Sequence, residues 1–415
     1  MSQSPLHVGS FQPGKPVIPA SDLIRSIEQR RGVALFAKGF RPLFLCAAVY
    51  AVLAVPLFLL ELDGYVRAGA YLPPMYWHAH EMVFGFTGAV LGGFLLTAVA
   101  NWTGRATAEG GALALLVVLW IAGRAGMLVP EHLPRYLPAF LDLSFLPALL
   151  IACARPILKT RNRRNYGFLA ILGALFTANA SIHAAALGAI SSAWEHRGNL
   201  VAVDVLVVAL VVMTGRVVPL FTRNALGAED VRAHPVFERL AAAAVVALAL
   251  VDVFDAPLAA TGTVCALGAL FTACRMRSWG SARALRAPLL WILHAGSLWI
   301  VAGLALRAAA ACSSIPFASG LHALTAGALG SLTLGMMTRV GLGHTGRLLA
   351  VPRRIAFAFA AVLFGAVARV LAPVLWPGAL GPLAVAGVVW SGAFAIYLAT
   401  YAPVLVAPRV DGKPG

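Results

Sequence analysis

Long apolar stretches recur along the whole chain, separated by short polar connections. Each stretch has about 18 to 25 residues, enough for an α-helix to cross a bilayer core of roughly 30 Å. The connections are too short to hold a soluble domain. The pattern therefore predicts an all-α polytopic membrane protein with twelve transmembrane helices. We number these as spans one to twelve, at residues 43–62, 79–100, 112–129, 137–154, 167–190, 199–220, 237–254, 257–274, 288–309, 318–341, 355–373 and 379–402.

The polar ends divide the chain into three parts. Residues 1–40 are polar and rich in proline, and we predict a cytoplasmic tail there. Residues 41–404 form the twelve-helix transmembrane domain, and residues 405–415 form a second short cytoplasmic tail. No cleavable signal segment precedes span one, so we expect that span to remain as an anchor.

Composition agrees with a membrane protein, because 60% of the residues are hydrophobic, 12% are charged and the mean hydropathy is +0.85. The net charge of +16 would suit a nucleic-acid partner if the basic residues were spread evenly. Instead they gather on alternate connections, as the positive-inside rule requires, which predicts that both termini are cytoplasmic and argues against nucleic acid. The basic groups on the cytoplasmic side include Lys15, Arg25, Arg30, Arg31, Lys38, Arg41, Arg155, Lys159, Arg161, Arg163, Arg164, Arg275, Arg277, Arg283 and Arg286, against Arg67, Arg135 and Arg197 on the other side.

Cysteine usage and short motifs exclude several site classes. The five cysteines stand singly, with no Cys-x-x-Cys, and are typical of small core residues rather than of disulfides or thiolate metal sites. No Walker loop, Rossmann glycine run, Gly-x-Ser-x-Gly or His-Glu-x-x-His is present.

Spans two, six and ten end with similar sequence motifs. Residues 96–105, 213–224 and 337–347 each contain a Thr near the membrane exit, then a second Thr with an Arg within two residues of it. The four-span spacing predicts three units, or arcs, of four helices. The alternative is that Thr, Gly and Arg are simply common where helices leave membranes.

Span two opens with Trp77-His78-Ala79-His80-Glu81-Met82. Ionisable groups at a membrane helix mouth are costly and usually functional, and histidine is the commonest metal ligand. The segment therefore suggests a metal or haem site. Because residues two apart on a regular helix point about 200° away from each other, His78 and His80 should serve different partners unless the helix begins between them. Glu81 is one turn from His78, and either orients it or binds a metal itself.

The other histidines sort by membrane depth. His183 and His322 fall on the outer side with His78 and His80, whereas His294 and His344 fall on the inner side. His322 and His344 are roughly 33 Å apart at 1.5 Å per residue, so one site cannot use both. A structural hydrogen bond between helices is the alternative for any single histidine. Those in the tail or the connections are expected to be solvated: His7, His132, His196 and His234.

The chain resembles the NnrS family of bacterial membrane proteins. The resemblance rests on residues 39–42 (Gly-Phe-Arg-Pro), 77–86, 101–105 (Asn-Trp-Thr-Gly-Arg), 215–224 and 339–347. It implies a twelve-helix protein of the bacterial inner membrane that carries haem and copper. It also implies a role linked to nitric oxide and protection from nitrosative stress, without a defined reaction.

The chain is also similar to the main subunit of haem–copper oxidases and nitric oxide reductases, whose twelve helices form three arcs of four. In that resemblance His78 stands at the low-spin haem ligand position, and His322 would supply the opposite axial ligand. Span six has no histidine and span seven no His-His pair, so the usual three-histidine copper centre cannot be carried over. His80, His183 and Glu81 would have to build a different second site.

Other polar residues within the spans have several candidate roles. Asn179 is one turn before His183 and shares its face, so we expect it at the same site. Arg216, Arg339, Asn179 and Asp204 are candidates to pair with haem propionates, to relay protons or to form hydrogen bonds between helices. For the two arginines, which lie near the inner membrane exits, snorkelling to the membrane surface is the simpler explanation.

We therefore predict a protein that binds haem b through His78 or His80 with His322, and copper through His80, Glu81 and His183. His294 and His344 are inner-side alternatives. The ligand is nitric oxide or a related small gas, and the electron donor a quinol or another reductant. One alternative is an enzyme, a divergent nitric oxide or oxygen reductase. The other is a metal or haem transporter, for which we find no convincing pair of spans interrupted by Gly or Pro at mid-membrane in matching positions.

Overall fold

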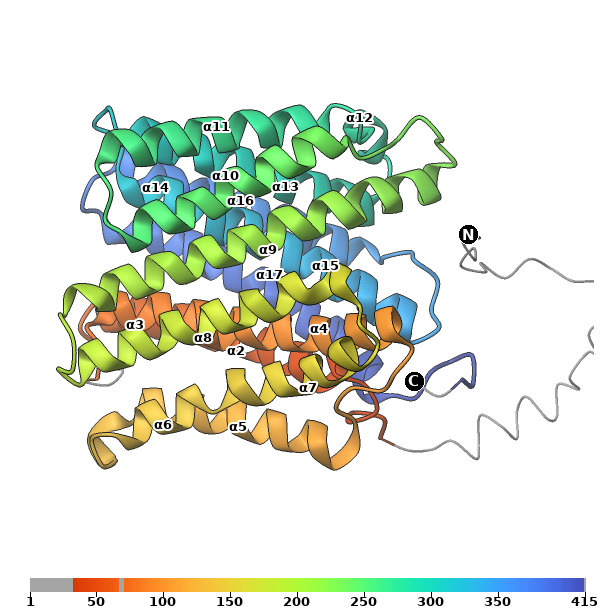
Figure 1. The fold of residues 1–415 in the computed structure, drawn as a ribbon, viewed down its shortest axis with the longest axis horizontal. Helices are drawn as coiled ribbons and strands as arrows, with labels where there is room; N and C mark the ends of the chain where they lie inside the picture. The colour runs from red at the N-terminus through yellow and green to blue at the C-terminus, as the bar shows by residue number, and fades with distance from the viewer. Residues whose placement is uncertain (1–32, 67–70, 414–415) are drawn as a thin grey trace, which may run out of the picture.

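The computed structural model describes residues 33–66 and 71–413, which form a bundle of long helices running side by side (Figure 1). The described residues contain no strand, so the predicted all-α fold is confirmed. The bounds are α2 Phe40–Leu62, α3 Pro74–His80, η1 Glu81–Thr87, α4 Gly88–Thr103, α5 Gly110–Leu128, η2 Pro130–His132, α6 Leu137–Leu143, α7 Phe145–Lys159, η3 Arg163–Asn165, α8 Tyr166–Ala186, α9 Ala193–Leu226, α10 Pro235–Val253, α11 Leu258–Met276, α12 Ser281–Ala284, α13 Pro288–Ala310, α14 Phe317–His322, η4 Ala323–Leu329, α15 Gly330–His344, α16 Arg353–Leu375 and α17 Leu380–Val406.

Eleven helical segments in the described part of the chain are long and apolar enough to cross a membrane. The remaining predicted span, 237–254, corresponds to α10, a 19-residue helix that packs between α9 and α11. It differs from the others because each 18-residue stretch within it contains three charged residues, Glu238, Arg239 and Asp252. Length and composition thus identify eleven of the twelve predicted spans, and the twelfth is present as the helix α10 without meeting these criteria.

Several boundaries differ from the predicted ones. Span four is two helices, α6 and α7, that meet at Ser144. Span six is longer than 199–220, because α9 begins at Ala193, and His196 therefore lies in its first turn rather than in a connection. The tail predicted at 1–40 is described only from residue 33 onward, so His7 and most of its basic residues lie outside the described residues, as does Arg67.

Spans two, six and ten form the middle of the bundle. We compared the buried fraction of an 18-residue apolar stretch in each candidate span. This fraction is 78% in Pro74–Thr103, 67% in Ala193–Leu226 and 67% in Phe317–His344, and it is at most 56% in any other candidate span. The remaining spans pack against their chain neighbours around these three, and α17 returns to α2. The second helix of each predicted four-helix unit is thus the innermost one.

The contact between the first and last spans explains one of the sequence motifs. Arg41 is fully buried and donates hydrogen bonds to Leu405 O at 2.9 Å and Ala407 O at 2.6 Å, at the end of α17. These carbonyls lack helical partners because the helix ends there. A Cβ at Gly39 would lie 2.5 Å from Leu96 Cβ, so α4 can approach only a glycine at that position.

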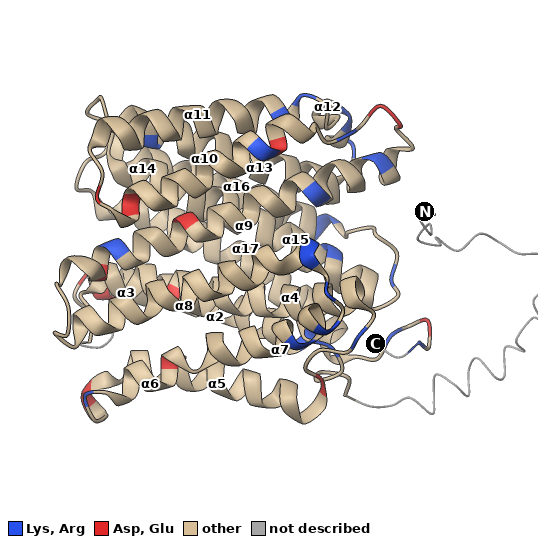
Figure 2. Ribbon diagram, in the orientation of Figure 1, with Lys and Arg blue, Asp and Glu red and all other residues tan. Residues whose placement is uncertain are grey.

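The two ends of the bundle differ in charge (Figure 2). We call the end with the connections 129–136, 187–192 and 311–316 the histidine end. The opposite end, with connections 160–165, 277–287 and 345–352, we call the arginine end. Most Lys and Arg residues lie toward the arginine end, where the C-terminus also lies.

Candidate metal centre

Spans two and ten share an interruption close to the histidine end. In span two, α3 begins with a proline at its first turn, ends at His80 and passes into the π-helical segment η1. In span ten, α14 follows Pro316, ends at His322 and passes into the π-helical segment η4. Single π-helical turns inside α-helices are rare and often mark functional sites. The two histidines therefore occupy equivalent places in two central spans.

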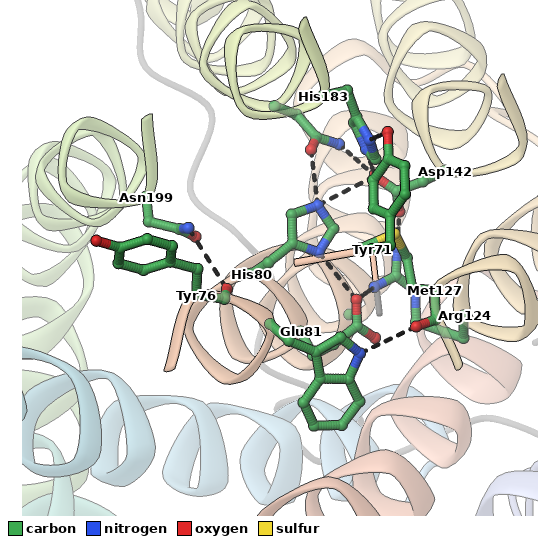
Figure 3. Close-up of polar contacts among 12 residues, drawn as sticks. Tyr71, Tyr76, His80, Glu81, Arg124, Met127, Asp142, His183 and Asn199 are labelled. Atoms are coloured by element: carbon green, nitrogen blue, oxygen red, sulfur yellow. Dashed lines mark hydrogen bonds and ion pairs between the residues drawn. The ribbon is translucent and has the colours of Figure 1, made fainter. Parts of the chain in front are cut away.

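Three buried side chains converge beside η1 (Figure 3). His80 comes from the end of α3, Asp142 from the end of α6 and His183 from α8. Asp142 Oδ2 lies 2.9 Å from His183 Nε2 and 3.3 Å from His80 Nε2. One nitrogen or oxygen of each residue lies within 4.8 Å of the others, which is close enough for the three to hold one metal ion.

A second set of contacts, made by Glu81 and Arg124, holds His80 and Asp142 in position (Figure 3). Glu81 Oε1 lies 2.9 Å from His80 Nδ1 and accepts a 2.5 Å hydrogen bond from Arg124. The other terminal nitrogen of Arg124 pairs with Asp142 Oδ1, and the hydroxyl of Tyr50 donates to Glu81 Oε2. Metal-binding histidines commonly donate their second N–H to a carboxylate, which sets the ring orientation. Glu81 holds this position, and it contacts His80 rather than His78.

Both ring nitrogens of His80 contact oxygen atoms. Its Nδ1 faces Glu81 and its Nε2 lies 2.8 Å from Asn179 Oδ1, while the amide nitrogen of Asn179 donates to Asp142 at 2.7 Å. Nε2 also lies 3.3 Å from Asp142 Oδ2, so it is the ring nitrogen available to a metal ion shared with Asp142.

Tyr71 closes the cluster from the connection before α3. Its hydroxyl lies 3.0 Å from His183 Nδ1. Burial raises the pKa of Tyr71 to about 12, although the charge of Arg135 acts in the opposite direction. The phenol is therefore neutral at physiological pH and available to hydrogen-bond with the ring nitrogen that does not face Asp142.

His78 points to a different set of groups. It interacts electrostatically with His322 and Arg369, and its ring stacks on Phe58 with centroids 4.0 Å apart. His78 Nδ1 is buried and has no hydrogen-bond partner among the described residues. His322 Nδ1 donates to Ala318 O at 2.8 Å, which leaves Nε2 as the nitrogen with a free lone pair. The structure thus separates His78 and His80, as their spacing predicted.

The inner-side histidines lie in other surroundings. His294 contacts the Thr222 hydroxyl through Nε2 at 2.9 Å and the Ser281 hydroxyl through Nδ1 at 3.0 Å, so both of its nitrogens are used between helices. His344 lies at the end of α15 with its ring 5.7 Å from that of Phe40. Neither belongs to a group of three or more potential metal ligands in the described part of the chain.

The two predicted arginines also lie toward the arginine end. Arg216 donates to Asn165 Oδ1 at 2.9 Å and Arg339 stacks over Phe221, 3.8 Å from the ring centroid. The structure therefore brings His80, His183 and Asn179 together, places His78 and His322 within electrostatic reach of each other and of Arg369, and leaves these two arginines apart from both groups.

Sequence reasoning missed Asp142, Arg124 and Arg369, although each is an ionisable residue within an apolar span. Such residues are functional candidates by default, so this signal was available. A second missed signal is the pattern Pro-x5-His-x4-Gly-x2-Gly, which occurs at 74–88 and again at 316–330. It coincides with the two π-helical segments.

The middle of the bundle contains an apolar cavity of about 100 Å³. Its walls come mainly from the three central spans, with contributions from α2, α8 and α13. The hydroxyls of Thr87 and Thr214 line it but donate to carbonyls of their own helices, at 2.8 and 2.7 Å. The cavity therefore offers an apolar surface with few free polar groups.

A family model described as NnrS protein matches residues 34–409, which is nearly the whole chain. The comparison with curated proteins found no match.

Proposed function

The chain belongs to the NnrS family, which indicates a general role in the response to nitric oxide, and from this premise we propose a more specific function. The protein binds one haem and one copper ion near the histidine end of its bundle. It acts in nitric oxide metabolism and protects the cell from nitrosative stress. The observation that carries the proposal is the presence of two adjacent but separate histidine groups, one at His78 and one at His80.

His78 and His322 are the residues that would hold a b-type haem. The unpartnered Nδ1 of His78 and the free Nε2 of His322 have the chemistry that an iron ligand needs. Arg369 supplies a buried positive charge beside them, which suits a propionate group. The haem would supply one-electron redox chemistry, and the protein residues hold and orient it.

His80, His183 and Asp142 are the proposed copper ligands. Two imidazoles and a carboxylate suit a first-row transition metal better than Mg²⁺ or Ca²⁺, which prefer all-oxygen sites. Glu81 and Tyr71 would fix the two rings, and Arg124 would hold the carboxylates. This assignment replaces the predicted ligand Glu81 with Asp142 and gives Glu81 the orienting role.

The cavity between the central spans supports a small uncharged ligand. Apolar cavities of this kind stay dry and bind apolar molecules and gases. Its apolar walls admit a diatomic molecule such as nitric oxide. Nitric oxide partitions into apolar surroundings, so the membrane is its route to this site.

We place the protein in the bacterial inner membrane with both termini in the cytoplasm. The support is the gathering of Lys and Arg at the arginine end, which the positive-inside rule assigns to the cytoplasm. Both metal groups then lie toward the periplasmic side.

An optical spectrum with metal analysis of the purified protein tests the proposal. We expect a haem Soret band that is lost in His78→Ala and in His322→Ala, whereas His80→Ala and His183→Ala keep the band and lose copper. The matched control is His132→Ala, because His132 is exposed. A purified protein without a Soret band, or a band unchanged in both His78→Ala and His322→Ala, contradicts the proposal.

A reductase remains the second candidate, favoured by the close spacing of the two groups. His78 and His80 are two residues apart on α3, so a haem and a copper ion held by them would be neighbours. Steady consumption of nitric oxide with a quinol donor would support an enzyme. Binding of nitric oxide without turnover would return the protein to a binding or sensing role.

A further inference from the structure

A buried ionic group lies apart from the histidines, between α9, α10 and α13. Arg307 donates to Asp204 Oδ1 at 2.7 Å and to Asp252 Oδ2 at 2.5 Å. The three residues are 2%, 0% and 9% exposed. Each comes from a different helix, so the group joins three neighbouring helices inside the apolar bundle.

The charges of this group do not balance if both carboxylates are ionised. The charged groups that act on Asp204 are Arg307 and Asp252, while Cys265 of α11 is the further titratable group that interacts with Arg307. From α14, the ring of Phe317 covers Arg307 at 5.2 Å. One guanidinium against two carboxylates leaves one negative charge, which is expensive to bury in a membrane interior.

The positions of the two carboxyl groups indicate how this charge is removed. The two terminal nitrogens of Arg307 each hold one oxygen of a carboxyl group, so both carboxyl groups lie against one guanidinium. One proton on the pair would make the group of three neutral and would give one carboxyl group a donor. Asp204 Oδ2 is buried and receives no hydrogen bond from a protein donor among the described residues. We propose that Asp204 and Asp252 bind one proton between them and form a proton-binding site distinct from the metal centre.

A metal ion does not suit this position. Arg307 already occupies one oxygen of each carboxylate, and no imidazole belongs to the group. In the described residues, the group of three potential metal ligands is the one at His80, Asp142 and His183. The ligand that fits between two carboxylates held by an arginine is a proton.

The proton exchanges with water at the histidine end. Asp252 lies one residue before the end of α10, and its side chain is 8% exposed. Asp255 follows in the connection and pairs with Arg197 at the surface. Asp252 is therefore the entry carboxyl and Asp204, which is fully buried, the inner one.

Infrared spectroscopy of the full-length protein in lipid tests the site. At neutral pH we expect the C=O band of one protonated carboxylic acid, which shifts when aspartate is labelled with ¹³C and when water is replaced by ²H₂O. Both Asp204→Asn and Asp252→Asn should abolish it, because the single remaining carboxylate is neutralised by Arg307 and ionises. Asp255→Asn is the matched control and should keep the band, since Asp255 is exposed.

The proposal is overturned if the unmodified protein lacks the band, if the band ignores aspartate labelling, or if it survives both Asn substitutions. The labelling arm uses the unmodified protein, so it decides the question even when a variant fails to fold. Haem spectrum and copper content measured on the same samples should stay unchanged, which separates this site from the proposed metal centre.

Discussion

Two histidines separated by one residue serve two different groups in this protein. His80 contacts His183 and Asp142, whereas the ring of His78 stacks on Phe58 and lies within electrostatic reach of His322 and Arg369. Their opposite directions follow from helix geometry alone, since α3 is regular through both residues. Their partners come from distant spans, so spacing alone could not identify them.

Asp142 is the residue that distinguishes a metal site from a histidine pair. Its Oδ2 contacts both imidazoles and the Asn179 amide. We expect Asp142→Asn to lower the copper content of the purified protein by at least about tenfold, as loss of groups at metal sites commonly does, while the haem spectrum stays unchanged. Metal analysis after dialysis against a weak chelator measures this change.

Asp230→Asn is the matched control for that change, because Asp230 is exposed and pairs with Arg283 at the other end of the bundle. The Arg283 hydrogen bond holds the pKa of Asp230 below its usual value, so this control also removes an ionised, paired aspartate. Equal copper contents in the Asp142→Asn variant and the control would remove Asp142 from the site.

At the scale of the element, the two π-helical segments shape the spans that carry the histidines. Each has a glycine at its fifth position, and each glycine is covered by an aromatic ring. A Cβ on Gly85 would lie 2.6 Å from the Tyr50 ring, and a Cβ on Gly327 2.6 Å from the Trp299 ring. The glycines therefore allow neighbouring helices to approach the widened backbone closely.

We expect Gly85→Ala to disturb the metal centre through Tyr50. The added methyl must displace the ring whose hydroxyl bonds Glu81, and overpacking of this kind costs about 1–3 kcal/mol. Copper content and thermal unfolding temperature should both fall. Gly173→Ala in α8 is the matched control, because open space surrounds that position and alanine is favoured over glycine in helices by up to about 1 kcal/mol. A Gly85→Ala protein as stable and as copper-rich as the control would exclude this packing role.

The elements differ in how far the sequence determines them. Long apolar stretches predict the spans well, since any helix of that length and composition satisfies its backbone within the membrane. The π-helical segments were not predicted because regular periodicity assumes 3.6 residues per turn. The division of span four at Ser144 was missed for a similar reason, since the apolar pattern continues across the junction.

At the scale of the whole molecule, the site could be only half predicted. His80, His183 and Asn179 share one depth in the membrane, which the alternation of spans indicates. Asp142 and Arg124 belong to spans four and three, and their approach to His80 depends on how the helices pack around the centre. That packing depends on all the spans together, so no single sequence motif predicts it.

The orientation of the whole bundle gives the last prediction. Cys312 is exposed in the connection between α13 and α14, at the histidine end, whereas the other four cysteines are buried or half-buried. If the arginine end is cytoplasmic, a membrane-impermeant maleimide added to intact spheroplasts should label the protein, and Cys312→Ser should abolish that labelling.

Leu348 lies at the arginine end and is 87% exposed, so Leu348→Cys in the Cys312→Ser background supplies the matched probe. That variant should be labelled only after the membrane is permeabilised, because its thiol faces the cytoplasm. The opposite orientation is indicated if, in intact spheroplasts, the Leu348→Cys variant is labelled and Cys312 of the unmodified protein is not. Both histidine groups would then lie on the cytoplasmic side.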